Sequence, residues 1–100
     1  MSTFKKNQLI RVIECIGKAA NFNEDKILSF VNKYLSYEEY EVAIKDLICE
    51  IHEEFSKKKK EILDYSLDMI KNISNNFFAS KEEMINYIKC QKVGITEWIK

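Results

Sequence analysis

Cys49 and His52 are the residues of this sequence whose types and spacing come nearest to chemistry. A thiol and an imidazole at i, i+3 share a helix face, where they suit a zinc ion or a nucleophile–base pair. Zinc would need further ligands, and Cys15 and Cys90 stand alone, with no Cys-x-x-Cys pair. The sequence contains no glycine loop for an oxyanion hole, Walker loop, Rossmann pattern or His-Glu-x-x-His motif. It therefore predicts no enzyme, no cofactor and no metal site.

Carboxylates are the second concentration of reactive groups. Seven of them, against one lysine, fall between Leu35 and Phe55. Residues 37–56 sum to −6 (seven acids, one lysine), whereas residues 1–36 (six basic, three acidic) and 57–100 (nine basic, six acidic) each sum to +3. The whole chain, with 16 basic and 16 acidic residues, is neutral. A neutral chain that gathers negative charge in one segment offers a local surface that attracts cations.

Five of these carboxylates fall on one arc of a helix, beside its apolar stripe. We call them the acidic face: Glu39, Asp46, Glu50, Glu53 and Glu54. Asp46, Glu50 and Glu54 follow one another at i, i+4, where each like-charged pair costs roughly a few tenths of a kcal/mol. Two interpretations stay open. The face is an ordinary solvated surface, partly balanced by neighbouring helices, or it is a binding surface that steers toward a basic protein.

Three tyrosines cluster at the start of the acidic segment: Tyr34, Tyr37 and Tyr40. Tyr34 and Tyr40 lie on apolar stripes and are predicted in the core. Tyr37 lies where cover by neighbouring helices is expected to be thin, so core and interface stay equally open for it. In the interface interpretation, Tyr37 adds apolar area at the edge of the acidic face.

The run Lys57–Lys60 is a local cluster of positive charge. Four consecutive helical residues point in four directions, and no aromatic residue is interleaved as it is in binders of single-stranded nucleic acid. We expect a solvated junction between two helices, where the lysines interact favourably with the negative C-terminal end of the acidic helix. Zero net charge and a single arginine also argue against nucleic acid as a partner.

Helices must position these groups, because two glycines and no proline are too few turn residues for hairpins or a β-sandwich. Caps and apolar spacing predict helices that begin near Ser2 or Thr3, then at Asn23, Ser36, Ser56 and Ser80. Ser36 and Ser80 each precede a glutamate by three residues, the pattern of a capping box. The clearest apolar stripe belongs to the third helix: Tyr40, Ile44, Leu47, Ile48, Ile51 and Phe55.

The predicted fold is all-α: one domain, residues 1–100, in which about five helices form a compact bundle. The stretch Asn72–Asn76 ends the fourth helix, and Gly94 is the expected C-cap of the fifth. The tail after Gly94 carries Ile95, Trp98 and Ile99, which we expect to fold back onto the bundle. Because an exposed Trp98 would support a dimer, a monomer and a weak dimer both stay open.

No targeting or membrane segment is expected. The N-terminal apolar residues are interrupted by Arg11, Glu14 and Lys18, unlike a signal peptide, and no stretch approaches about 18 uninterrupted apolar residues. The three cysteines are isolated and odd in number, which is typical of a reducing compartment. We expect a soluble cytoplasmic protein with no membrane partner.

The stretch LSYEEYEVAIKDLICEIHEEFS, followed by KEILDYSLDMIKNI, resembles the MafI-type immunity proteins of bacterial toxin systems. The chain is also similar in size to contact-dependent growth inhibition immunity proteins, which are often helical. The resemblance spans roughly Ile27–Ile73 and is carried by Glu39, Tyr40, Glu41, Ala43, Leu47, Glu53 and Glu54. It implies a protein that binds one cognate toxin domain, often a ribonuclease or deoxyribonuclease, and blocks it. The acidic helix would then occupy or overhang the basic cleft of the toxin as a phosphate mimic.

A second function stays open: a small adaptor or regulatory protein of a mobile element, acting by helix-in-groove contact with another protein. The neighbouring gene separates the two, because a toxin C-terminus upstream favours immunity, and a phage or plasmid operon favours the adaptor. A DNA-binding helix-turn-helix protein is disfavoured by the zero net charge.

Overall fold

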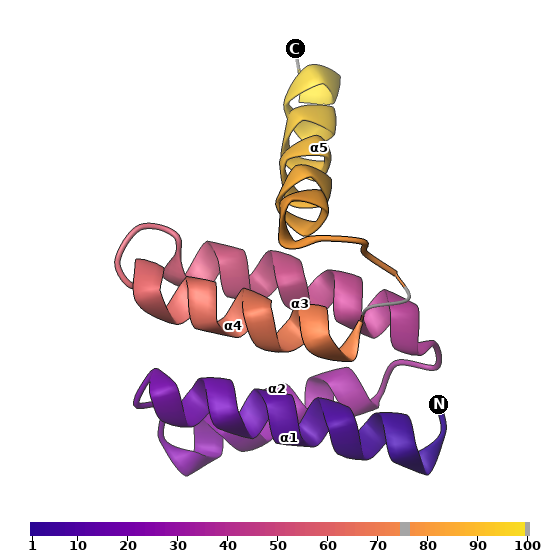
Figure 1. Ribbon diagram of the computed structural model, residues 1–100, viewed down its shortest axis with the longest axis vertical. Coiled ribbons are helices and arrows are strands. Elements are labelled where there is room, and N and C mark those ends of the chain that lie inside the picture. Colours follow the sequence, from indigo (N-terminus) through magenta and orange to yellow (C-terminus); the bar gives the residue numbers. More distant parts are fainter. Residues whose placement is uncertain (75–76, 100) are drawn as a thin grey trace.

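The computed structural model describes residues 1–74 and 77–99, and the side chains of residues 1–74 and 77–90. Five α-helices and no strand occur in these ranges. They are α1 (Thr3–Ala19), α2 (Glu24–Leu35), α3 (Tyr40–Phe55), α4 (Lys60–Ile73) and α5 (Lys81–Ile99) (Figure 1). The predicted all-α bundle of about five helices is confirmed. Over the same ranges, no helix is long and apolar enough to span a membrane.

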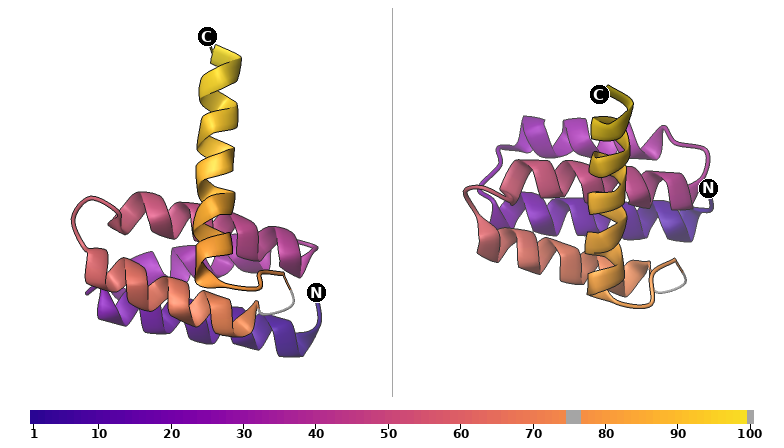
Figure 2. Two further views of the ribbon diagram at one scale, coloured as in Figure 1. Left: turned by 45° about the horizontal axis from the view of Figure 1, so that its top comes forward. Right: turned by 90° about the horizontal axis from the view of Figure 1, so that it is seen from above.

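Helices α1 to α4 form an antiparallel bundle in which each helix reverses the direction of the one before it (Figure 1). The α1–α2 hairpin lies against the α3–α4 hairpin, with contacts from α1 to α4 and from α2 to α3. The short connections between these helices favour antiparallel neighbours. Helix α5 stands upright on the α3–α4 pair and contacts both helices (Figure 2).

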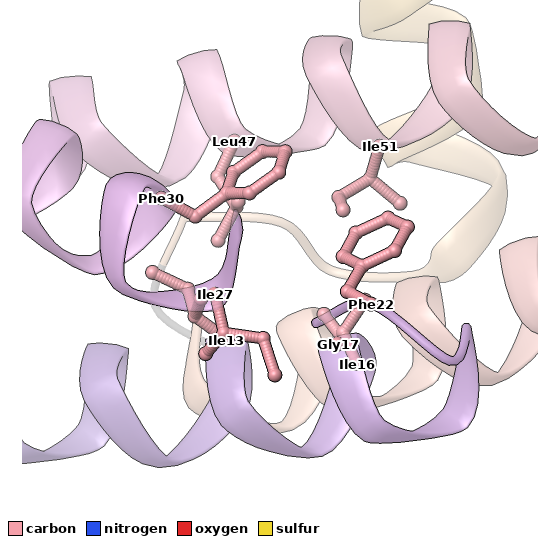
Figure 3. A pocket seen from close by; sticks show the side chains of 8 residues that line it. All are labelled: Ile13, Ile16, Gly17, Phe22, Ile27, Phe30, Leu47 and Ile51. Atoms are coloured by element: carbon pink, nitrogen blue, oxygen red, sulfur yellow. The ribbon is translucent and has the colours of Figure 1, made fainter. Parts of the chain in front are cut away.

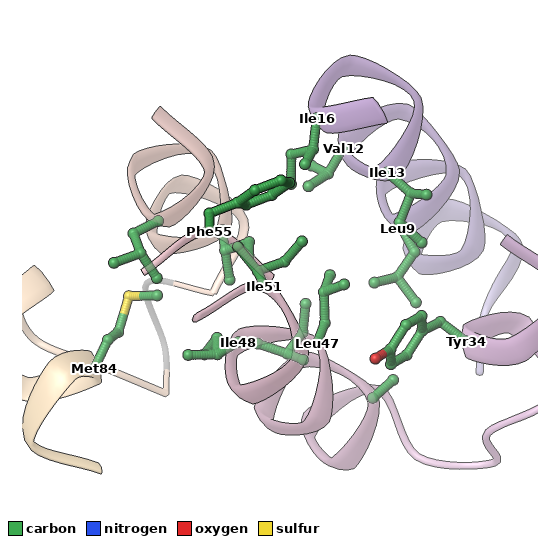
Figure 4. Close-up of a cluster of buried hydrophobic side chains, with 14 of the residues drawn as sticks. Leu9, Val12, Ile13, Ile16, Tyr34, Leu47, Ile48, Ile51, Phe55 and Met84 are labelled. Atoms are coloured by element: carbon green, nitrogen blue, oxygen red, sulfur yellow. The ribbon is translucent and has the colours of Figure 1, made fainter. Parts of the chain in front are cut away.

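Helix α3 is the centre of the core, with α2, α4 and α5 as neighbours. All six residues of its predicted apolar stripe are buried. Phe55 points toward Ile16 of α1, and Ile48 lies on the side from which Met84 of α5 packs (Figure 4). Full burial of one such side chain stabilises a fold by roughly 1.5–3 kcal/mol, so this stripe helps to hold the α1–α2 hairpin against the α3–α4 hairpin. Its opposite side is the one that can carry charge.

Three of the predicted helix starts are confirmed by cap hydrogen bonds. The side chains of Ser2 and Asn23 accept from the backbone N–H three residues on, at 3.2 and 2.8 Å. Ser80 Oγ accepts from the Glu83 N–H at 3.2 Å, and Glu83 Oε2 reaches back to the N–H of Ala79 at 2.6 Å. These bonds satisfy donors that a helix start leaves without partners.

The predicted capping box at Ser36 is wrong. Ser36 is the C-cap of α2, and its hydroxyl donates to the carbonyl of Lys33 at 2.6 Å. Helix α3 begins only at Tyr40, with Glu39 at its N-cap and no side-chain cap bond. The ring of Tyr37 stacks on that of Tyr34, with centroids 5.6 Å apart, so the chain closes α2 before it turns into α3.

The predicted start at Ser56 is also wrong, since Ser56 is the C-cap of α3 and α4 begins at Lys60. The junction predicted for the lysine run is nevertheless present between these helices. At the other end of the chain, α5 runs through Gly94 to Ile99, so Gly94 is not its C-cap. The predicted packing of Ile95, Trp98 and Ile99 on the bundle concerns side chains outside the described residues.

Candidate functional site

The acidic face lies along the seam between α2 and α3, and two ion pairs cross that seam. Lys26 Nζ is 2.9 Å from Glu54 Oε1, and Lys33 Nζ is 2.8 Å from Glu50 Oε2. The two lysines lie two turns apart on α2 and therefore meet α3 on one side. The sequence left open whether neighbouring helices partly neutralise the acidic face. For Glu50 and Glu54 they do, because lysines of α2 pair with both carboxylates.

These ion pairs are exposed enough to exchange with another cation. The side chains of Lys26 and Glu54 are 43% and 39% exposed, and those of Lys33 and Glu50 are 51% and 30% exposed. Pairs in such positions contribute about 0–1 kcal/mol. They neutralise two carboxylates without locking them, so a better cationic ligand can displace the lysines.

Two tyrosines fix carboxylates of the acidic face from below. Tyr34, which is buried, donates its phenolic hydrogen to Glu50 Oε2, the oxygen that also accepts from Lys33. Tyr37, half-buried, donates in the same way to Asp46 Oδ2. The hydrogen bond to Asp46 raises the pKa of Tyr37 to about 12. Burial, followed by the bond to Glu50, raises the pKa of Tyr34.

An aromatic stack runs beneath the seam. Ring centroids of successive members lie 5.9, 5.9, 6.4 and 5.6 Å apart, with interplanar angles of 7° to 26°. In order along the stack, the rings are Phe55, Phe22, Phe30, Tyr34 and Tyr37. Aromatic pairs contribute about 0.5–1.5 kcal/mol each beyond their buried area. Four of the rings belong to α2 and the loops at its ends, and the pair of Phe22 and Phe55 joins them to α3.

The structure brings most of the predicted site residues together. A shallow hollow on the seam is lined by Lys33, Tyr34, Asp46, Cys49, Glu50 and Glu53. Glu54 borders the next hollow, toward the C-terminal end of α3, and Tyr37 contacts Asp46. Glu39 lines neither hollow, because it is the N-cap at the far end of α3.

Glu53 differs from its neighbours on the acidic face. It is exposed, and no lysine, arginine or hydroxyl bonds to its carboxylate among the residues whose side chains the structure describes. Counting Asp46, Glu50, Glu53 and Glu54 against Lys26 and Lys33, four negative charges meet two positive ones. The seam therefore keeps two negative charges, those of Asp46 and Glu53, and of these two Asp46 accepts a hydrogen bond from Tyr37.

Sequence reasoning missed Lys26 and Lys33 as parts of this site. Their spacing of seven residues was a signal, since it places both on one side of α2. Which side of α2 meets α3 depends on how the helices pack together, and the sequence of α2 alone does not specify that packing. The lysines thus became predictable partners only with the arrangement of the helices.

Cys49 and His52 lie on α3, both half-buried. Within residues 1–74 and 77–90, no group of three or more His, Cys, Asp or Glu side chains is placed to hold a metal ion. A small pocket between α1, α2 and α3 is no better suited to chemistry, because its lining is apolar (Figure 3). It is bounded by Ile13, Ile16, Gly17, Phe22, Ile27, Phe30, Leu47 and Ile51.

Comparison with known proteins gave no relative: no family model, curated protein or solved structure matches this chain.

Proposed function

We propose that this chain is an immunity protein that binds a cognate toxin domain with a basic surface, of the nuclease class, and neutralises it through the acidic face. One observation carries the proposal. Asp46, Glu50 and Glu53 border a single hollow, and the half-buried Tyr37 lies against Asp46 at its edge. Carboxylates next to aromatic area suit arginine and lysine side chains, which bind both kinds of group.

The hydrogen bonds beneath the face favour rapid and specific binding. Tyr34 and Tyr37 already hold the carboxylates of Glu50 and Asp46 in place. These two side chains therefore lose less conformational entropy when a partner binds. Lys26 and Lys33 also act as placeholders that a toxin arginine displaces, since a bidentate guanidinium–carboxylate pair is stronger than a lysine contact. The remaining negative charge steers a basic partner toward the seam.

Protection from a nuclease follows from occupancy alone. A nuclease that grips a phosphate backbone lines its cleft with lysine and arginine. Carboxylates on a rigid helix match such a cleft, so substrate and inhibitor compete for the same cations. The inhibitor needs no catalytic group, in agreement with the lack of a nucleophile or metal motif in the sequence.

The test uses the protein encoded immediately upstream of this chain as the probe. The variant Asp46→Lys with Glu53→Lys reverses two charges of the acidic face and leaves both seam ion pairs in place. We expect its affinity for the probe to fall by about a hundredfold or more, with loss of growth protection when both proteins are co-expressed.

The matched control reverses two exposed charges elsewhere: Glu14→Lys on α1 with Glu61→Lys on α4. It changes the net charge equally and should keep affinity within about threefold, because it leaves the seam intact. Circular dichroism of both variants checks that the helices are retained. If the acidic-face variant binds and protects like the unmodified chain, the proposed mechanism is wrong.

A further inference from the structure

Opposite charges adjoin each other at the C-terminal end of α3. Glu53 and Glu54 are exposed in its last turn, and Lys57, Lys58 and Lys59 follow in the loop to α4. Together with Phe55, these five side chains border one hollow. We call Glu53, Glu54, Lys57 and Lys58 the charged corner.

The two halves of the charged corner do not neutralise each other. Among the described side chains, neither Glu53, Lys57 nor Lys58 has an opposite charge within ion-pair distance. The reason is local, because α3 ends at Phe55 and the turn after it removes the i, i+4 geometry that would pair these residues. Glu54 instead bonds to Lys26, and Lys59 donates to the carbonyl of Ala20 at 3.2 Å.

A second copy of the same chain is the partner that this corner fits. A two-fold axis between the acidic and the basic half places each half on the opposite half of the other copy, and the contact closes after two subunits. The chain carries no net charge, with 16 basic and 16 acidic residues, so the copies do not repel each other at long range.

We propose that two copies associate through the charged corner, with Glu53 and Glu54 of each facing Lys57 and Lys58 of the other. The association is weak and salt-sensitive, because exposed ion pairs dominate it and the nearest large apolar residue, Phe55, is only 1% exposed.

This dimer would regulate the acidic face. Glu53 and Glu54 belong both to the charged corner and to the acidic face, so one carboxylate pair cannot hold a second copy and a basic toxin together. This consequence rests on the proposed function, whereas the self-association does not. A basic toxin with higher affinity would separate the dimer and release two monomers.

Sedimentation equilibrium at millimolar protein measures the association directly. For the unmodified chain we expect the dimer fraction to fall at least fivefold as salt rises from about 0.01 M to about 1 M, over which the Debye length shrinks from roughly 30 Å to 3 Å. A chain that is monomeric at the lower salt concentration, or a dimer fraction that salt leaves unchanged, would overturn the proposal.

A charge swap makes the test specific. The variants Glu53→Lys with Glu54→Lys, and Lys57→Glu with Lys58→Glu, should each be monomeric, because each juxtaposes like charges. An equimolar mixture of the two should regain dimers, since both contacts are then complementary. Dimers of either variant alone, or a mixture that stays monomeric while both variants remain helical by circular dichroism, would refute this interface.

The lysine-side variant also separates this inference from the proposed function. Lys57→Glu with Lys58→Glu leaves every residue of the acidic face unchanged. If the acidic face binds the toxin, this variant should retain its binding to the protein encoded upstream, whereas its loss of dimers in sedimentation reports on the charged corner.

Discussion

Gly17 of α1 and Ile27 of α2 are in such close contact that a methyl group on Gly17 would lie 2.5 Å from Cγ1 of Ile27 and 2.9 Å from its Cδ1. Both residues border the apolar pocket that α1 and α2 form with α3 (Figure 3). Glycine in a helix normally lowers stability by about 0.5–1 kcal/mol relative to alanine. At position 17 its missing side chain lets α1 and α2 approach closely.

We therefore expect Gly17→Ala to lower the free energy of unfolding by about 1–3 kcal/mol through overpacking, despite the gain in helix propensity. Urea unfolding followed by circular dichroism measures this change. Ile27→Ala removes the atoms that clash, so the double variant should be more stable than the sum of the single effects predicts. If the two substitutions change the free energy of unfolding additively, the contact between Gly17 and Ile27 is not the cause of the loss in Gly17→Ala.

Asn21 is the residue after the C-cap of α1 and has a positive φ of 58°. Its N–H donates to Lys18 and the N–H of Phe22 donates to Gly17, at 3.2 and 2.9 Å, which is a Schellman motif. Because glycine adopts this conformation without strain, Asn21→Gly should raise the free energy of unfolding by up to about 1 kcal/mol, and Asn21→Ala should lower it by about 1 kcal/mol.

The control for Asn21 is Asn32→Gly, at an exposed position inside α2. The same substitution there should lower the free energy of unfolding by a few tenths of a kcal/mol, roughly, because a helix interior disfavours glycine even more than asparagine. Urea unfolding measures both changes. If the two glycine substitutions change the free energy of unfolding in the same direction, Asn21 does not have the positive φ of a Schellman motif in solution.

Ser36 and Ser80 share a capping-box pattern, but only Ser80 forms the cap. We expect Ser80→Ala to lower the free energy of unfolding by about 1 kcal/mol, whereas Ser36→Ala should cost less than about 0.5 kcal/mol. Thermal unfolding of the two variants at equal protein concentration compares them. A larger loss at Ser36 would mean that α3 begins earlier than Tyr40.

The bond from Tyr37 to Asp46 predicts a pH dependence in the alkaline range. The pKa of Tyr37 is raised from 10.0 to about 12, so the folded state binds the phenolic proton more tightly than the unfolded state. The resulting stabilisation is fully present below pH 10 and is lost as the pH rises through about 12. Tyr37→Phe should therefore be less stable than the unmodified chain at neutral pH, and this difference should shrink between pH 10 and 12.

Urea unfolding across this pH range measures the difference, and Tyr65→Phe is the matched control. Tyr65 is 45% exposed on α4, far along the chain from the acidic face. Its substitution should shift stability by an amount that stays nearly constant over the same range. If Tyr37→Phe behaves like Tyr65→Phe, the phenol does not hold Asp46 in solution.

Much of the fold was predictable because helical periodicity acts over short distances. The stripe from Tyr40 to Phe55 repeats over four turns and is buried as expected. The caps at Asn23 and Ser80 were also predictable, since a cap depends on residues within one turn. The prediction of a cap at Ser36 was wrong because an i, i+3 pattern contains no information on the stacking of Tyr37 on Tyr34, which accompanies the later start of α3.

The candidate site was predictable only in part, for a related reason. The arc that Asp46, Glu50 and Glu53 share follows from the helical repeat alone. The partners of Glu50 and Glu54 come from α2, and no local pattern specifies which lysines a neighbouring helix presents. Long-range packing therefore decided how much of the negative charge stays available.

The five stacked rings have a consequence for what a ligand can recognise. Four of the rings lie on α2 and in the loops at its two ends, and the fifth, Phe55 of α3, joins the stack through Phe22. The stack therefore stiffens α2 together with its flanking loops, and the two tyrosines at its end donate to Glu50 and Asp46. A protein that recognises this chain thus meets these two carboxylates at positions preset by the rings, and it must bring its cations to those positions.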